Sequence, residues 1–169
     1  MFDRPDSTSE CSPEELLERI NEALEQLGST ARYKKIPDAS PGCESLKGKR
    51  ITMVDDSKNV LEGFIPELMV ATGGLASLIY QQKQTVNELV EEALATSSDA
   101  ILMDYMLRGF YGDTVVRKLK EKNPSLLCIG FSSTEKRAFE RIGVPAVRKN
   151  VLDMQGSLQD IARIMKAAS

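Results

Sequence analysis

Three acids, a serine and a lysine are the residues whose types and positions give this chain a chemical site. The run ITMVDD ends with the adjacent acids Asp55 and Asp56, and the run ILMD ends with Asp104. Further along, LLCIGFS ends with Ser132 and PAVRK ends with Lys149. Neighbouring carboxylates repel one another and resist burial, so this pattern favours a bound cation.

The residue types point to magnesium and to phosphoryl chemistry. Oxygen ligands with few protein donors favour a hard cation such as Mg²⁺. The chain has no histidine, which excludes His-based triads and HExxH zinc sites. A lysine offers a point charge to a phosphoryl group, and a serine hydroxyl donates to its oxygens. With no other nucleophile nearby, an aspartate is the expected acceptor, giving an aspartyl phosphate.

The elements that position these residues alternate along the chain from residue 50. Short apolar runs predict strands at 50–54, 75–81, 100–104, 126–133 and 145–149. Helices are expected at 57–74, 85–97, 112–124, 134–143 and 157–168, the last with Ser157 as its N-cap. Continuous apolar strands are typical of a parallel sheet covered on both faces, so we predict a doubly wound α/β fold. In such sheets ligands bind beyond the carboxyl ends of the strands, where the acids, the serine and the lysine converge.

The N-terminal part of the chain carries a separate helix signal. Residues 12–28 begin with Ser12 as N-cap and Glu15 in a capping box, and they stop at Gly28. Apolar residues form one stripe along this helix, which leaves two alternatives open: docking on the chain's own domain, or binding a partner, including a second copy. Residues 29–49 lack a period and are expected to be a linker.

Composition excludes several classes of protein. The net charge of −3 argues against a nucleic-acid binder. No apolar run approaches the roughly 20 residues that span a bilayer, and the polar start, residues 1–10, does not resemble a secretory signal. Three widely spaced cysteines, Cys11, Cys43 and Cys128, suggest reduced thiols. We therefore expect a cytoplasmic protein without membrane insertion.

Four segments together resemble a known family. VDDSKNV (54–60), SDAILMDYML (98–107), GFSST (130–134) and VRKN (147–150) are similar, in this order, to the receiver domain of two-component response regulators. The resemblance covers about residues 50–168. It implies a flavodoxin-like five-stranded parallel sheet over residues 50–169, preceded by the helix and linker of residues 1–49.

The resemblance also implies roles for individual residues. Asp104 would be the phosphoacceptor. Mg²⁺ would be bound by Asp56, Asp104 and the backbone carbonyl of Met106, and by Asp55 through water. Ser132 would contact the phosphoryl group, and Lys149 would pair with Asp104 and then with the phosphoryl group. Ser133, next along the chain, is expected to be a helix N-cap.

The implied function is phosphate-dependent signalling rather than enzymatic turnover. The donor would be a sensor histidine kinase or a histidine phosphotransfer protein. With no output domain expected after residue 169, a downstream protein partner would read the signal, and the N-terminal helix would offer a surface for a homodimer.

Two departures from the family pattern support an alternative function. Asn150 follows Lys149 where receivers usually have proline, and Ala146 stands where an aromatic residue is usual. A pseudo-receiver, acting as a protein-binding module without phosphorylation, is therefore the second hypothesis. A hydrolase of the aspartate-nucleophile phosphatase type is disfavoured, because it needs an acid two residues after the nucleophile, where this chain has Met106.

Overall fold

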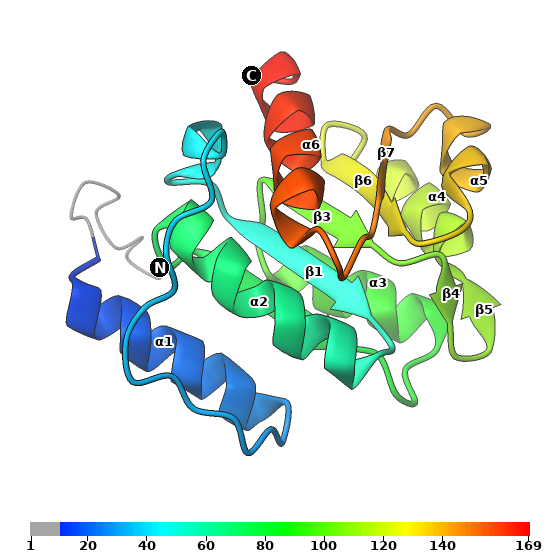
Figure 1. Cartoon of the computed structure of the whole chain (residues 1–169). Coiled ribbons are helices and arrows are strands. Elements are labelled where there is room, and N and C mark those ends of the chain that lie inside the picture. The colour runs from blue at the N-terminus through cyan, green and yellow to red at the C-terminus, as the bar shows by residue number, and fades with distance from the viewer. Residues whose placement is uncertain (1–10) are drawn as a thin grey trace, which may run out of the picture.

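A single parallel sheet organises the chain (Figure 1). The computed structural model describes residues 11–169, so residues 1–10, and the expectation about a secretory signal there, lie outside the described part. The sheet has five strands in the order β2-β1-β3-β6-β7, and all four pairings are parallel. These strands are β1 (Ile51–Asp55), β2 (Ala76–Tyr80), β3 (Ala100–Met103), β6 (Leu127–Ser132) and β7 (Ala146–Arg148). The predicted doubly wound α/β fold is confirmed.

Helices cover both faces of the sheet, and each face has its own apolar core. The helices are α1 (Pro13–Gln26), α2 (Lys58–Thr72), α3 (Val86–Ala95), α4 (Gly112–Lys122), α5 (Lys136–Glu140) and α6 (Met154–Ala167). One core joins α1, α2 and α6 to the sheet, and the other joins α3, α4 and α5 to it. Among the helices of residues 11–169, none is long and apolar enough to cross a membrane.

The predicted N-terminal helix is present and docks on its own chain. Ser12 and Glu15 form the expected capping box. The helix contacts α2, and Leu16, Ile20 and Leu24 of its apolar stripe are buried there. Docking in cis therefore occupies most of the stripe that sequence reasoning had also offered to a partner.

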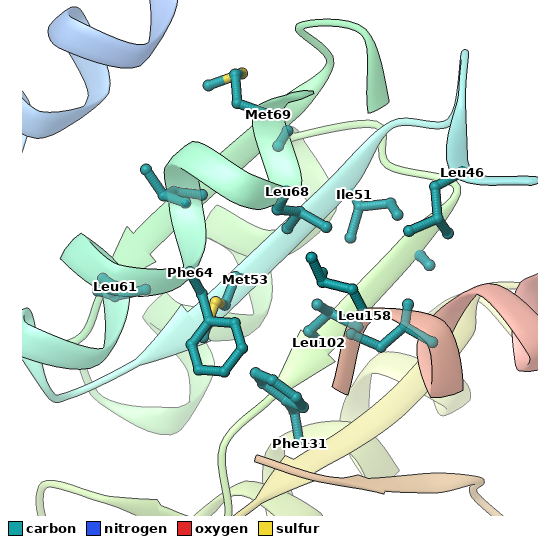
Figure 2. Close-up of a cluster of buried hydrophobic side chains, with 14 of the residues drawn as sticks. Leu46, Ile51, Met53, Leu61, Phe64, Leu68, Met69, Leu102, Phe131 and Leu158 are labelled. Atoms are coloured by element: carbon teal, nitrogen blue, oxygen red, sulfur yellow. The ribbon is translucent and has the colours of Figure 1, made fainter. Parts of the chain in front are cut away.

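The segment after α1 also contributes to the core. A short 3-10 helix, Glu44–Leu46, places Leu46 in full burial. Figure 2 shows Leu46 in the same cluster as Ile51 of β1 and Leu158 of α6. The predicted linker thus packs against the sheet although its sequence shows no period.

The start of α6 differs from the prediction. The N-cap is Asp153, whose carboxylate accepts a hydrogen bond from the Gly156 amide at 2.9 Å, so the helix begins one turn earlier than expected. Asp is as good an N-cap as Ser. The prediction of Ser157 as the N-cap was therefore wrong, and its hydroxyl is used elsewhere.

A small hairpin follows β3 and was not predicted. Strands β4 (Met106–Leu107) and β5 (Phe110–Tyr111) pair antiparallel. Gly109 in the turn has φ +90°, a conformation that favours glycine. Two-residue strands are too short to show an alternating pattern, which is why sequence periodicity missed them.

Candidate functional site

The three predicted acids meet at the carboxyl edge of the sheet. Asp55 is the last residue of β1, and Asp104 follows β3 with its amide donating to the Val54 carbonyl at 3.0 Å. Asp56 follows Asp55 at the start of the loop to α2. Each of the three acids offers a carboxylate oxygen, and these oxygens lie within 4.8 Å of one another. Strand order explains this, because β1 and β3 are neighbours.

Lys149 joins the acids from the end of β7. Its Nζ donates to Asp55 Oδ2 at 2.6 Å and to Asp104 Oδ1 at 2.8 Å. All three side chains are buried. The contact with Asp104 was expected, whereas the equally close contact with Asp55 was not. Sequence spacing cannot show which of the adjacent acids Asp55 and Asp56 faces the lysine at the end of β7.

Burial raises the pKa of both buried acids. For Asp104, burial is the largest cause, repulsion from Asp55 adds to it, and Lys149 opposes it, leaving a pKa of about 6. Burial also raises the pKa of Asp55 against the opposing effect of Lys149. Burial works against the charge of Lys149, but Asp55 and Asp104 together outweigh it and raise the lysine pKa. The lysine is therefore the firmly charged member of the group.

The acid cluster matches the requirements of Mg²⁺. Three carboxylates and one ammonium carry a net charge of −2 when fully ionised, which one divalent cation neutralises. All the side-chain donors are oxygens, as this ion prefers. Both Asp55 oxygens are already engaged, one by Lys149 and the other by the Ser57 amide at 2.8 Å. Within residues 11–169, by contrast, no hydrogen bond or ion pair occupies the half-buried Asp56 carboxylate.

Ser132 is the last residue of β6, the strand that neighbours β3. It is 1% exposed, and its Oγ accepts hydrogen bonds from the amides of Thr134 at 3.3 Å and Glu135 at 3.1 Å. The hydroxyl proton is left free to donate. Ser133 is exposed, and α5 has Glu135 at its N-cap without a side-chain bond, so the predicted cap role of Ser133 was wrong.

Met106, the predicted source of a carbonyl ligand, lies in the β4–β5 hairpin. The residue is 55% exposed. Sequence reasoning missed Gln81, which anchors this hairpin. Gln81 is fully buried, and its side chain pairs with the Arg108 backbone in both directions, accepting from the amide at 2.8 Å and donating to the carbonyl at 3.2 Å. The backbone amide of Gln81 donates to the Asp55 carbonyl at 2.9 Å.

A glycine allows the next helix to start against the backbone of Asp104. Gly112 begins α4, and its amide donates to the Tyr105 carbonyl at 2.7 Å. A Cβ at this position would lie 1.8 Å from the Asp104 carbonyl oxygen, far inside contact distance. The close approach therefore requires glycine, and it fixes the chain on the C-terminal side of Asp104.

Comparison with solved structures agrees with this fold. No family model matches the chain, and no curated protein matches it. Among solved structures, it is similar to a two-component response regulator of the LuxR family from Aurantimonas sp. (TM-score 0.56, 21% identity, covering 70% of this chain and 86% of that one). It is also similar to a CheY-like receiver domain protein from Methanospirillum hungatei (TM-score 0.56, 16% identity, 72% and 98% covered).

A further similar structure is the receiver domain of the histidine kinase CKI1 from Arabidopsis thaliana, complexed with Mg²⁺ and BeF₃⁻ (TM-score 0.51, 18% identity, 75% and 95% covered). At these identities the likeness establishes architecture rather than activity. The chain has the receiver fold, with α1 as an additional N-terminal helix.

Proposed function

We propose that this protein is a response-regulator receiver that accepts a phosphoryl group on Asp104 in the presence of Mg²⁺. The observation that carries the proposal is the bridge from Lys149 to Asp55 and Asp104, beside a third acid, at the ligand-binding edge of a receiver fold. A buried ammonium next to an acid with a raised pKa is typical of a functional site rather than of a stabilising ion pair.

Mg²⁺ would be held by Asp56, Asp104 and the backbone carbonyl of Met106, with Asp55 acting through water. The engaged oxygens of Asp55 and the unoccupied carboxylate of Asp56 support this division. When bound, the ion supplies positive charge to the oxygens of the phosphoryl group.

The chain's own residues account for the transfer. A carboxylate oxygen of Asp104 attacks the phosphorus of a phosphohistidine; the O–P bond forms, the N–P bond breaks, and the electron pair stays on the donor's imidazole. Lys149, within 2.8 Å of Asp104, places its charge where the phosphoryl oxygens arrive. Ser132 turns its free hydroxyl proton towards the same group.

The donor would be a sensor histidine kinase or a histidine phosphotransfer protein, and the phosphorylated state would be read by a downstream protein partner. The protein would act as a phosphate carrier in the cytoplasm rather than as an enzyme with repeated turnover. The negative charge added at Asp104 would alter the hairpin and the segment after Ser132, and so change affinity for the partner.

Two positions favour a second candidate, a pseudo-receiver that binds its partner without phosphorylation. Asn150 follows Lys149, and the half-buried Ala146 of β7 carries no aromatic ring at the position where receivers usually have one. In this alternative the acids and Lys149 remain as a folded cluster without accepting phosphate.

Intact-mass measurement after treatment with acetyl phosphate separates the two candidates. With Mg²⁺, the wild-type protein should gain one phosphoryl group, located at Asp104 by peptide mapping. Asp104→Asn should gain none, and the matched control Asp38→Asn, at an acid outside the cluster, should behave as wild type. An unmodified wild-type protein that also fails to bind beryllofluoride, while still binding a partner, would establish the pseudo-receiver instead.

A further inference from the structure

Ser157 makes two hydrogen bonds outside its own helix. It lies in the first turn of α6 and is 3% exposed. Its hydroxyl donates to the Arg148 carbonyl at 2.9 Å and accepts from the Asn150 amide at 3.1 Å. These two groups flank Lys149 in the chain, so one side chain closes a bridge across the backbone of the lysine.

Lys149 is thereby held from two sides. Its own amide donates to the Ser132 carbonyl at 2.9 Å, which extends the pairing of β6 with β7 by one residue. Ser157 holds the flanking peptide groups from α6. A lysine side chain has many rotamers, and the reach of its ammonium group depends on where its backbone is placed. Fixing the backbone therefore restricts where Nζ lies.

Apolar packing does not fix the loop that follows Lys149. Val151 is 56% exposed and Leu152 is 95% exposed. The loop is closed by polar bonds: Asn150 Oδ1 accepts from the Leu152 amide at 3.0 Å, and the Asn150 carbonyl accepts from the Asp153 amide at 3.1 Å. Ser157 is the buried group that ties this polar loop to the body of α6.

The bridge depends on the residue that follows the lysine. Proline has no amide hydrogen and would leave Ser157 with one bond, whereas Asn150 supplies the second. The departure from the family pattern at Asn150 thus comes with a contact that proline could not make.

We propose that Ser157 is the positioning residue for Lys149, holding its ammonium group where it meets both Asp104 and an incoming phosphoryl group. This inference rests on the proposed function, because it assigns Ser157 a part in phosphoryl binding. Ser157 bonds only backbone groups beside Lys149 and none of the acids, so its loss removes no Mg²⁺ ligand.

Beryllofluoride binding by the full chain, measured by calorimetry at saturating Mg²⁺, tests the proposal. Ser157→Ala should weaken beryllofluoride binding about tenfold, the scale expected when a charged group is displaced by a fraction of an ångström. Mg²⁺ affinity should not fall, because a displaced Lys149 ammonium competes less with the ion for Asp55 and Asp104. The Asn150 amide should exchange its hydrogen faster than in wild type, because its acceptor is gone.

The matched control is Ser45→Ala. The Ser45 hydroxyl also bonds a backbone carbonyl of α6, that of Ala162 at 3.0 Å, but Ser45 lies in the 3-10 helix rather than beside Lys149. This variant should bind beryllofluoride as wild type does. Comparing the two variants separates loss of any hydroxyl bond to α6 from loss of the bridge at Lys149.

Three results would overturn the inference. Equal beryllofluoride affinity of wild type and Ser157→Ala would show that the bridge does not position the lysine. A parallel loss of Mg²⁺ affinity would show that Ser157 supports the fold in general. A wild-type protein that binds no beryllofluoride would refute the proposed function itself, and the inference with it.

Discussion

Removing the charge of Asp104 should stabilise the metal-free protein at neutral and alkaline pH. Burial, together with repulsion from Asp55, raises the pKa of Asp104 from its ordinary value of 3.8 to about 6. The folded protein therefore binds a proton more tightly than the unfolded chain. The contribution of Asp104 to stability is greatest below its unfolded pKa and is lost as pH rises through its folded pKa.

The size of the effect follows from the two pKa values. They differ by about two, and one pKa unit corresponds to about 1.4 kcal/mol, so the ionised acid costs about 3 kcal/mol above pH 6. Asparagine is uncharged but keeps an oxygen that can accept from Lys149, now 2.8 Å from Asp104 Oδ1. Asp104→Asn should therefore gain up to about 3 kcal/mol at pH 8 and almost nothing at pH 4.

Urea denaturation in EDTA, repeated from pH 4 to pH 8, measures this difference. The control Asp38→Asn, outside the acid cluster, should show a much smaller gain, because Asp38 only weakly repels the partly buried Glu67. Adding Mg²⁺ should narrow the gap, because the ion binds the folded wild-type protein, whereas Asp104→Asn removes one of its proposed ligands. Equal stability of wild type and variant at pH 8, or a gain that is the same at pH 4, would refute the electrostatic argument.

Three further substitutions test other parts of the structure. Leu24→Ala, at a core position of α1 that is 1% exposed, should lower the free energy of unfolding in urea by about 2–5 kcal/mol; a change near zero would mean that α1 does not dock on α2 in solution. Gly112→Ala should abolish Mg²⁺ binding measured by calorimetry, because the new methyl group would overlap the Asp104 carbonyl, and normal binding would contradict this geometry. Gln81→Leu should speed hydrogen exchange at the Arg108 amide and weaken Mg²⁺ binding, since it removes both bonds to the hairpin; unaltered exchange would show that the hairpin is held by other contacts.

The fold could be predicted because its signals are local. Each strand of the sheet is a short apolar run in the sequence. The start of α1 is marked by a capping box of Ser12 and Glu15, which lie only three residues apart. The hairpin at Met106–Tyr111 and the start of α6 at Asp153 were missed or misplaced. Two-residue strands have no period, and Asp153 and Ser157 are both good N-cap residues, so sequence could not choose between them.

The sequence alone determined which residues gather at the site. Parallel strands place their carboxyl ends at one edge, so residues that end apolar runs, such as Asp55, Asp104 and Lys149, must come together there.

Only the tertiary structure decided how these residues are used. It shows that Lys149 bridges two acids, that Gln81 anchors the hairpin, and that Ser157 holds the backbone around the lysine. Each of these contacts joins segments that are separated in the chain. Their partners are set by side-chain direction and packing between elements, which the spacing of residues along one strand or helix does not record.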